Sequence, residues 1–349
     1  MRLQKSTPHL FVRADASSVI GSGHVMRCLA LSKAWQQSGG DISWLLAESI
    51  PAVEDRLRRE GFTLNTTDAS PGSKEDVEQT IAQARAARAD WVVVDGYRFS
   101  PDYLGRLKST GTRVLFLDDD GRFDFYPSDV VLNQNISANA AMYAQRAPET
   151  HLLLGSEYVL LRPEFLVDHA VPEHPKIARK ILVTMGGSDP GNTTHQVLLA
   201  FATLQRDFHA KVVVGGGNSR FNELLSLSHR LGPHVELLPS QDNMAPLMRW
   251  ADVAISGAGG TCWELAFTGL PAIVIALSND QQGIAQGLAD RGISVSLGWH
   301  ATLSKGQISG ALDRLLDDHS QRVSMSERGQ RLIDGRGASR VVQYLQNLL

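Results

Sequence analysis

Short apolar runs alternate with helical stretches along most of this chain, and no other feature limits the possible folds as strongly. Val, Ile and Leu predominate in the runs, which is typical of strands buried on both faces. Such strands, separated by helices, predict parallel sheets covered by helices. The predicted strands are Leu10–Val12, Ile42–Leu46, Phe62–Asn65, Trp91–Asp95, Val114–Leu117, Val130–Leu132, Leu152–Leu154, Ile181–Thr184, Val212–Val214, Val235–Leu238, Val253–Ile255, Ala272–Ile275 and Ile293–Val295.

The chain has 349 residues, which is enough for two such domains. Between Val167 and Lys180 the alternation stops, and prolines without apolar periodicity predict a linker. We therefore expect an α/β protein with two doubly wound, Rossmann-like domains, residues 1–170 and 176–349, the second ending in a helical segment from Lys305. Ligands of parallel sheets lie beyond the carboxyl ends of the strands, so a cleft between facing domains is the expected site.

The composition of the chain limits its expected cellular location and the kinds of partner that it can bind. With 43% hydrophobic and 20% charged residues and a net charge of −3, the chain is globular and has no general attraction for nucleic acid. The N-terminus lacks an apolar core and no apolar run reaches membrane length, so we expect neither a signal peptide nor a membrane partner. Cys28 and Cys262 are not spaced as a disulfide framework, which favours a cytoplasmic location.

A glycine-rich loop, residues 13–28, joins the first predicted strand to the first helix. Gly21 and Gly23 allow a tight turn and a close approach of the backbone to a ligand. His24 follows in the first helical turn. This histidine either acts on a ligand at the strand ends or is a solvated residue at a helix end, and the loop alone favours neither interpretation.

Acidic residues follow two of the later strands in the first half. Asp95 ends a strand, where it can orient a base or accept a sugar hydroxyl, and Tyr97 can stack or donate a hydrogen bond. Carboxylates in the run Asp118–Asp120 are potential magnesium ligands. Adjacent residues at a strand end point in alternate directions, however, so a turn with capping acids is the favoured interpretation and no metal is expected.

Loops rich in glycine and hydroxyl groups follow several strands of the second half. In Ser256–Glu264, the amides of Gly259, Gly260 and Thr261 start a helix and are ready for a diphosphate. Glu264 lies about one turn onward, where it either accepts hydrogen bonds from a ribose diol or complements the helix dipole.

Three further loops of the second half have a similar composition. Gly187 and Ser188 belong to a loop that can wrap phosphate oxygens but lacks the Gly-Lys-Ser/Thr of a P-loop. The run Val214–Asn218 is either another close approach of the backbone or a flexible turn, and the turn is the favoured interpretation. Asn279 and Asp280, with Gln281 beside them, either hold sugar hydroxyls or cap the next helix.

In order along the chain, these segments resemble the UDP-2,4-diacetamido-2,4,6-trideoxy-β-L-altropyranose hydrolases of pseudaminic acid biosynthesis. The combination is specific although each piece alone is not. The segments that carry the resemblance are Arg13–Ser17, Ile20–Cys28, Asp95–Tyr97, Asp118–Asp119, Leu132–Asn135, Leu154–Phe165, Gly186–Pro190, Asn243–Ala245 and Ser256–Thr261.

The resemblance implies a GT-B architecture and hydrolysis of a UDP-sugar without metal or cofactor, in which water attacks the anomeric carbon and UDP leaves. It also implies that His24 is catalytic. Because the reference pKa of histidine is near neutrality, we expect His24 to act as the general base of an inverting displacement. Asp15, Asp95 and Tyr97 complete the predicted catalytic group, with Asp15 or Asp95 fixing the tautomer of His24. The predicted substrate-binding residues are Arg13, Gly21, Gly23, Gly187, Ser188, Met244, Ser256, Gly259, Gly260, Thr261, Glu264, Asn279, Asp280 and Gln281.

Two departures from the family pattern bear on the sugar more than on the reaction. The family has Asn-Gln where this chain has Asn279–Gln282, so the residue in the place of the asparagine stays open. Gly96 stands where a larger polar residue is frequent. The alternative function is a GT-B glycosyltransferase that uses a UDP-N-acetylhexosamine-type donor and an acceptor other than water.

Overall fold

The computed structural model describes residues 7–17, 20–167 and 173–349. Three segments that enter the sequence predictions lie outside these ranges. They are residues 1–6, where a signal peptide would begin, residues 18–19 of the first glycine loop and residues 168–172 of the predicted linker.

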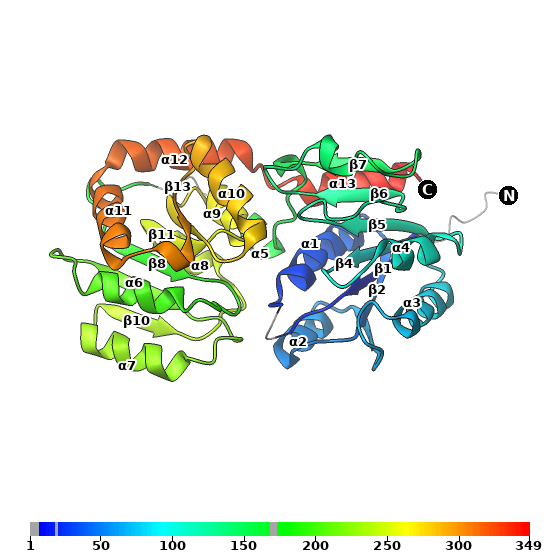
Figure 1. Ribbon diagram of the computed structural model, residues 1–349, viewed down its shortest axis with the longest axis horizontal. Helices are drawn as coiled ribbons and strands as arrows, with labels where there is room; N and C mark the ends of the chain where they lie inside the picture. Colours follow the sequence, from blue (N-terminus) through cyan, green and yellow to red (C-terminus); the bar gives the residue numbers. More distant parts are fainter. Residues whose placement is uncertain (1–6, 18–19, 168–172) are drawn as a thin grey trace. The chain divides into compact units, whose positions relative to one another are not determined.

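The chain divides into two compact units. The first comprises Met1–Pro163 together with Gly335–Leu349, and the second comprises Glu164–Asp334. Each is a parallel sheet with helices packed against it (Figure 1). The prediction of two doubly wound, Rossmann-like α/β domains is confirmed.

The sheet of the first unit has seven strands in the order β3-β2-β1-β4-β5-β6-β7, all parallel. The strand order reverses between β1 and β4, and in such sheets ligands bind at that point, beyond the carboxyl ends of the strands. Ala14 at the end of β1 is in register with Asp95 at the end of β4. The strands are β1 (His9–Ala14), β2 (Asp41–Leu46), β3 (Thr63–Thr66), β4 (Trp91–Asp95), β5 (Arg113–Leu117), β6 (Val130–Asn133) and β7 (His151–Leu154).

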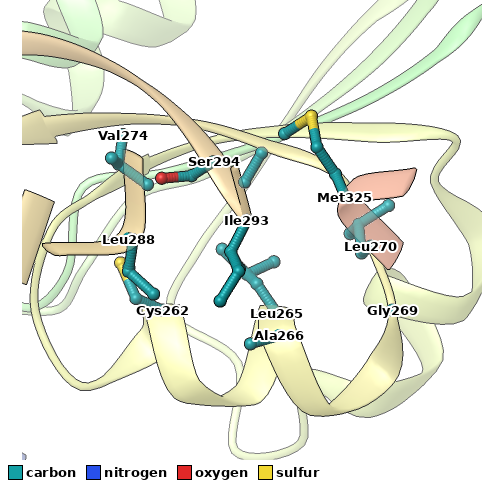
Figure 2. Close-up of a pocket in the computed structure, with 11 residues that line it drawn as sticks. Cys262, Leu265, Ala266, Gly269, Leu270, Val274, Leu288, Ile293, Ser294 and Met325 are labelled. Carbon is teal, nitrogen blue, oxygen red and sulfur yellow. The ribbon is translucent and has the colours of Figure 1, made fainter. Parts of the chain in front are cut away.

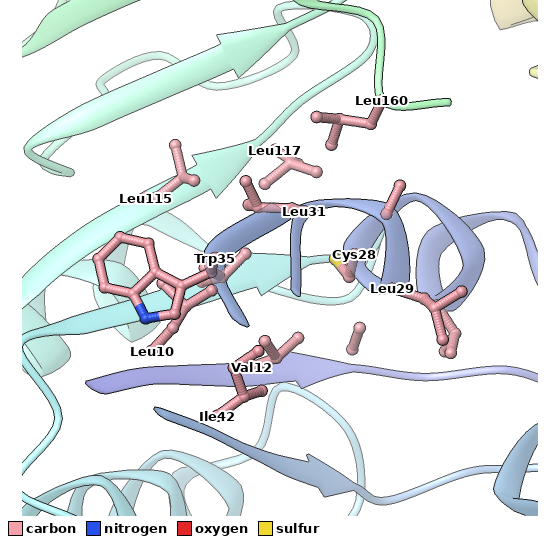
Figure 3. Close-up of a cluster of buried hydrophobic side chains, with 14 of the residues drawn as sticks. Leu10, Val12, Cys28, Leu29, Leu31, Trp35, Ile42, Leu115, Leu117 and Leu160 are labelled. Carbon is pink, nitrogen blue, oxygen red and sulfur yellow. The ribbon is translucent and has the colours of Figure 1, made fainter. Parts of the chain in front are cut away.

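Alternate residues of these strands pack on opposite faces of the sheet. In β4, Trp91 and Val93 belong to one buried cluster, whereas Val92 and Val94 belong to another. Figure 3 shows the first cluster, in which Leu10 and Val12 of β1 lie beside Leu31 and Trp35 of the first helix. Burial on both faces is the physical reason for the continuous apolar runs in the sequence. The helices of this unit are α1 (Gly23–Gln37), α2 (Pro51–Arg59), α3 (Lys74–Ala86), α4 (Pro101–Lys108) and α13 (Gly337–Asn347), with short 3-10 helices η1 (Ala140–Tyr143) and η2 (Ser156–Tyr158).

The last helix corrects the predicted domain limits. Residues 335–349 were expected to close the second domain, but α13 belongs to the first unit. Its face formed by Ala338, Val341 and Leu345 joins the core that contains α1. The spacing of these residues shows that the helix has an apolar face but does not show which core receives it.

The sheet of the second unit has six parallel strands in the order β10-β9-β8-β11-β12-β13 and reverses between β8 and β11. The strands are β8 (Lys180–Thr184), β9 (His209–Val213), β10 (Val235–Leu238), β11 (Val253–Gly257), β12 (Ala272–Ala276) and β13 (Ser294–Trp299). The helices are α5 (Pro163–Leu166), α6 (Thr193–Phe201), α7 (Phe221–Leu231), α8 (Ala245–Trp250), α9 (Thr261–Thr268), α10 (Asn279–Asp290), α11 (Lys305–Asp317) and α12 (His319–Leu332), with the 3-10 helix η3 (His300–Thr302). In the described ranges, no helix has both the length and the apolar character needed to cross a membrane.

Candidate active site

A histidine and an aspartate meet at the switch point of the first unit. His24 lies in the first turn of α1, and Asp95 is the last residue of β4. His24 Nδ1 is 2.7 Å from Asp95 Oδ1, and the two side chains are 8% and 0% exposed. A carboxylate can only accept at this contact, so Nδ1 carries the proton and Nε2 is the basic nitrogen of the neutral ring.

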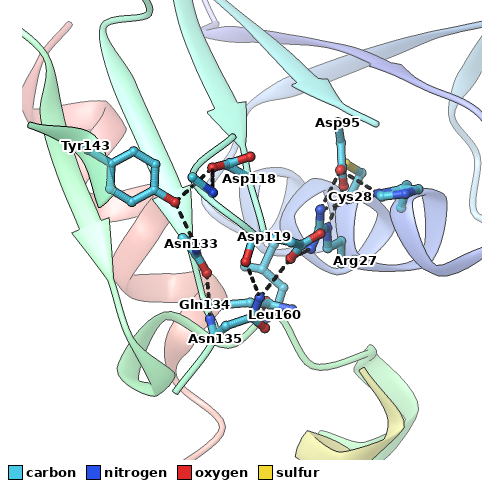
Figure 4. A network of polar contacts seen from close by, with 12 residues as sticks. Arg27, Cys28, Asp95, Asp118, Asp119, Asn133, Gln134, Asn135, Tyr143 and Leu160 are labelled. Atoms are coloured by element: carbon cyan, nitrogen blue, oxygen red, sulfur yellow. Dashed lines mark hydrogen bonds and ion pairs between the residues drawn. The ribbon is translucent and has the colours of Figure 1, made fainter. Parts of the chain in front are cut away.

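Arg27 lies one turn after His24 on the same helix and binds the same carboxylate. Its Nε donates to Asp95 Oδ2 and its Nη2 donates to Asp95 Oδ1, both at 2.6 Å. Its Nη1 donates to Asp119 Oδ1 at 2.7 Å. One guanidinium therefore joins the acid that ends β4 to an acid that follows β5, and these contacts are drawn in Figure 4.

The charges around Asp95 determine its protonation. Burial by itself would raise the pKa of Asp95, but the Arg27 guanidinium and His24 outweigh it and hold the pKa well below the usual range. Cys28 Sγ donates to Asp95 Oδ2 at 3.4 Å, and burial together with this carboxylate raises the pKa of the Cys28 thiol well above its ordinary value. Asp95 is thus held in its ionised form and accepts from three residues, His24, Arg27 and Cys28.

The network continues to the ends of β5 and β6 (Figure 4). Asn135 Nδ2 donates to both the backbone oxygen and Oδ1 of Asp119 at 3.1 Å. Asp118 accepts from Tyr126 and Tyr143 at 3.1 and 2.9 Å and from the backbone N–H of Gly121 at 2.8 Å. The last contact makes Asp118 a capping acid of a turn, as expected. Among the described residues, no group of three or more His, Cys, Asp or Glu side chains is placed to hold a metal ion.

Tyr97 lies at the edge of the His24 ring. The two ring centroids are 4.9 Å apart at an interplanar angle of 82°, and Tyr97 is 46% exposed. The Arg122 guanidinium lies 5.3 Å from the Tyr97 centroid and donates to the Gly96 oxygen. Of the four predicted catalytic residues, the structure therefore brings His24, Asp95 and Tyr97 together.

The fourth, Asp15, is engaged elsewhere. Its Oδ1 accepts from Arg13 Nη1 at 2.7 Å and from the backbone N–H groups of Ala47 and Glu48. Asp95, and not Asp15, is the acid beside His24. Arg13 is fully buried and also binds Asp76 with two donors at 2.9 Å, so its predicted substrate contact is replaced by a structural role.

The glycines of the first loop leave space at the site. A Cβ built on Gly21 or Gly23 would meet nothing within 4 Å, and Gly21 has the positive φ of 73° that its turn requires. A side chain would thus find open space at both positions, and the predicted contacts of Gly21 and Gly23 with a substrate stay predictions.

In the second unit, the loop between β11 and α9 presents backbone. Gly260 is exposed and is the N-cap of α9, so the N-cap residue brings no side chain to the first N–H groups of this helix. A Cβ at Gly260 would meet nothing within 4 Å, whereas one at Gly259 would lie 3.4 Å from Gln281 Nε2. Gln281 also accepts from the Leu277 N–H at 3.0 Å, so the loops after β11 and β12 lie together.

The N-terminus of α10 excludes one of the two predicted roles of Asn279 and Asp280, that of capping the helix. Helix α10 begins at Asn279 and its N-cap is Ser278, so neither Asn279 nor Asp280 is the capping residue. Both lie in the first turn, where Asn279 is exposed and accepts from Gln282 Nε2 at 3.2 Å. Their predicted contacts with sugar hydroxyls stay predictions.

The loop after β8 is exposed at Gly187 and half-buried at Ser188. Asp189 closes it, because its carboxylate accepts from the backbone N–H groups of Thr193 and Thr194 at the start of α6. Gly215 packs closely on this loop, since a Cβ there would lie 2.2 Å from the Gly186 oxygen. The run Val214–Asn218 is therefore a close backbone contact between two loops rather than a merely flexible turn.

Three other predicted residues of this unit are buried. Ser256 is 1% exposed and donates to the Gly257 oxygen, which gives it a structural role. Met244 is the N-cap of α8 and is 6% exposed. Glu264 is 7% exposed, and Thr261 beside it is half-buried.

An apolar pocket lies beneath α9 and is separate from the glycine loop. Cys262, Leu265, Leu288 and Met325 are among its lining residues (Figure 2). Burial, with a smaller effect of Glu264, raises the pKa of Cys262 to about 12. Cys262 is a packed residue that is 3% exposed, and its thiol is not activated.

Sequence reasoning left Arg27, Asp119 and Asn135 out of the predicted site. Their signal was present, since Arg27 follows His24 at the i+3 spacing of one helix face and Asp119 and Asn135 follow strands. All three stand in segments that carry the family resemblance. What the sequence lacked was the strand order, which puts β4 between β1 and β5.

Comparisons with known proteins identify the fold and one domain. Residues 181–338 match the glycosyltransferase family 28 C-terminal domain. The structure is similar to the crystal structure of MurG from Acinetobacter baumannii, with a TM-score of 0.67 and 17% sequence identity over 97% of this chain and 99% of that one. The chain therefore has the GT-B fold.

Two proteins of known sequence align with most of the chain. One is the spore coat polysaccharide biosynthesis protein SpsG of Bacillus subtilis, 25% identical over 97% of this chain and 98% of that protein. The other is the UDP-2,4-diacetamido-2,4,6-trideoxy-β-L-altropyranose hydrolase of Campylobacter jejuni, 24% identical over 81% of this chain and 97% of that protein.

Proposed function

We propose that this protein hydrolyses a nucleotide sugar, with His24 as general base and UDP as the leaving group. The pairing of His24 with Asp95 at 2.7 Å is the observation that carries the proposal. A buried carboxylate that holds the imidazole in one tautomer is the arrangement general base catalysis needs.

The proposed step is a displacement at the anomeric carbon. His24 Nε2 takes a proton from water as the water oxygen forms a bond to that carbon. The bond between the anomeric carbon and the diphosphate oxygen breaks, its electron pair leaves with UDP, and the configuration inverts. Asp95 stabilises the imidazolium that forms.

The second unit is proposed to bind the nucleotide. The open space around Gly260 and the exposed backbone at Gly187 support contacts between amides and the diphosphate. Glu264 is proposed to accept hydrogen bonds from the ribose hydroxyls. Binding of the leaving group through backbone N–H groups also stabilises the charge that develops on it.

The C. jejuni relative supports UDP-2,4-diacetamido-2,4,6-trideoxy-β-L-altropyranose as the substrate, because that hydrolase is named for this sugar. The free sugar would then enter pseudaminic acid synthesis in the cytoplasm. The alternative is a glycosyltransferase, which the family 28 C-terminal domain supports. In that case His24 would deprotonate an acceptor hydroxyl in place of water.

The test uses the purified chain and this UDP-sugar without acceptor and without added metal. NMR of the anomeric signals is expected to show UDP and a free sugar of inverted configuration. His24→Ala is expected to slow turnover roughly 10²- to 10⁴-fold, because it removes the base. Calorimetric titration with UDP is expected to give the wild-type affinity for this variant.

His229→Ala, on the exposed end of α7, is the matched control and is expected to match the wild type in both measurements. Turnover by His24→Ala at the wild-type rate would overturn the role of His24. An intact substrate that is consumed only after an acceptor is added would identify a transferase.

A further inference from the structure

We infer that Arg27 is a positioning residue that fixes the Asp95 carboxylate and, through it, the orientation of the His24 ring, and whose charge opposes a positive charge on that ring. The inference rests on the proposed function, in which His24 is the base. Arg27 itself is not proposed to touch the substrate.

The contact geometry is the first support. Two donors of Arg27 bind both oxygens of Asp95 at 2.6 Å, so the carboxylate cannot rotate without breaking them. His24 Nδ1 binds one of these same oxygens. Because Arg27 fixes the Asp95 carboxylate, it also fixes the orientation of the imidazole that is bound to that carboxylate.

The second support is the anchor of Arg27 itself. Its third donor binds Asp119, which in turn accepts from Asn135. Asp95 is in register with Leu117 in the neighbouring strand, two residues before Asp119. The guanidinium is held between the ends of two adjacent strands and is only 12% exposed, so its position does not depend on a mobile surface side chain.

The charges supply the third support. The groups in contact with His24 are Asp95 from β4, Arg27 from α1 and the Tyr97 ring, while Cys28 from α1 donates to Asp95. Arg27 Nη2 is 3.3 Å from His24 Nδ1, so its positive charge opposes protonation of the ring while Asp95 favours it. Without Arg27, the negative charge of Asp95 would act on the ring with no nearby positive charge to oppose it.

The experiment compares Arg27→Met with Arg27→Lys. NMR titration of the labelled His24 imidazole is expected to show a midpoint roughly one pH unit higher in Arg27→Met. The acid limb of UDP release against pH is expected to move by the same amount. Arg27→Lys keeps the charge but lacks the planar fork, so its midpoint is expected to stay near the wild type while turnover falls roughly tenfold to a hundredfold.

Arg106→Met removes a surface arginine that pairs with Asp102 on α4, and it is expected to leave both readouts unchanged. Arg27→Gln replaces Arg27→Met if that variant does not fold. An unchanged His24 midpoint in the neutral variant, or wild-type turnover in Arg27→Lys, would overturn the inference. If the wild type hydrolyses no UDP-sugar, the proposed function fails, while the His24 titration still decides whether Arg27 controls the ring.

Discussion

The two units end their sheets with different chemistry at equivalent places. Beyond β1 and β4 of the first unit, charged side chains meet in a buried network of His24, Arg27 and Asp95. Beyond β8 and β11 of the second unit, glycines expose backbone, as at Gly187 and Gly260. The same doubly wound topology therefore presents fixed charges in one unit and main-chain donors in the other.

Under the proposed function, this difference assigns proton transfer to the first unit and nucleotide binding to the second. A network of buried charges holds its members in one protonation state and one orientation, which suits proton transfer. Backbone N–H groups at helix starts bind anions without a charged side chain, which suits a diphosphate. Substitutions in the first unit should therefore change turnover, and substitutions in the second should change nucleotide affinity.

The largest effect is expected from Asp95→Asn. The variant leaves His24 without its anion and Arg27 with one buried partner fewer, so turnover should fall roughly a thousandfold. The free energy of unfolding should fall by about 3 kcal/mol, the cost of breaking a buried ion pair. Kinetics of UDP release and urea unfolding at neutral pH measure the two losses.

The stability loss of Asp95→Asn should depend on pH in one direction. Because the pKa of Asp95 is lowered by folding, its stabilisation is complete above the unfolded value near 4 and is lost as the pH falls further. The difference from the wild type should shrink below about pH 4. Asp102→Asn, at an exposed acid of α4, is the control, and an equal loss in that variant would contradict a special role of the buried network.

Gly260→Ala is expected to have a smaller effect than Asp95→Asn, and to weaken UDP binding while leaving the stability of the fold unchanged. Gly260 has φ −55° and ψ −26°, which alanine adopts freely, and its Cβ would meet nothing within 4 Å. The added methyl group should fit the fold, but it should clash with a diphosphate that approaches the backbone at this position. Calorimetry should show UDP binding weakened roughly tenfold, about 1.4 kcal/mol, at unchanged melting temperature.

Gly306→Ala is the matched control, since Gly306 lies near the start of α11 and also has open space around its Cβ. It should bind UDP as the wild type does. If Gly260→Ala binds UDP with the wild-type affinity, the loop before α9 does not hold the diphosphate and the division between the units fails.

Much of the fold could be predicted because both faces of each sheet are buried. The predicted run Trp91–Asp95 coincides with β4, all of whose residues are buried. The run Val235–Leu238 coincides with β10, although this edge strand is only partly buried. The membership of α13 could not be predicted, because an apolar helix face fits any core. The close contact of Gly215 with the Gly186 oxygen likewise depends on the approach of two separate loops.

The position of a site residue could be predicted where it depends on a single helix or strand. The contacts between residues from several elements could not be predicted. His24 was placed correctly by its own loop, and Asp95 by the end of its own strand. The sequence left open whether Asp15 or Asp95 supports His24, because that choice depends on side-chain direction at the end of β1. The contact between Arg27 and Asp119 joins residues 92 positions apart and depends on the strand order.

The smallest effects are expected from substitution of the two cysteines, one in each unit, and these variants also test the comparison between the units. Cys28 donates to Asp95 and belongs to the charged network, whereas Cys262 lines the apolar pocket under α9. Cys28→Ala should lower turnover severalfold, since Asp95 loses one weak donor. Cys262→Ala should leave turnover unchanged and lower the free energy of unfolding by about 1 kcal/mol through lost packing.

Because both thiols have a raised pKa, a thiol reagent at pH 8 should label neither cysteine in the folded protein and both after unfolding. Rapid labelling of Cys262 with loss of turnover would place chemistry in the second unit and contradict its assignment to nucleotide binding alone.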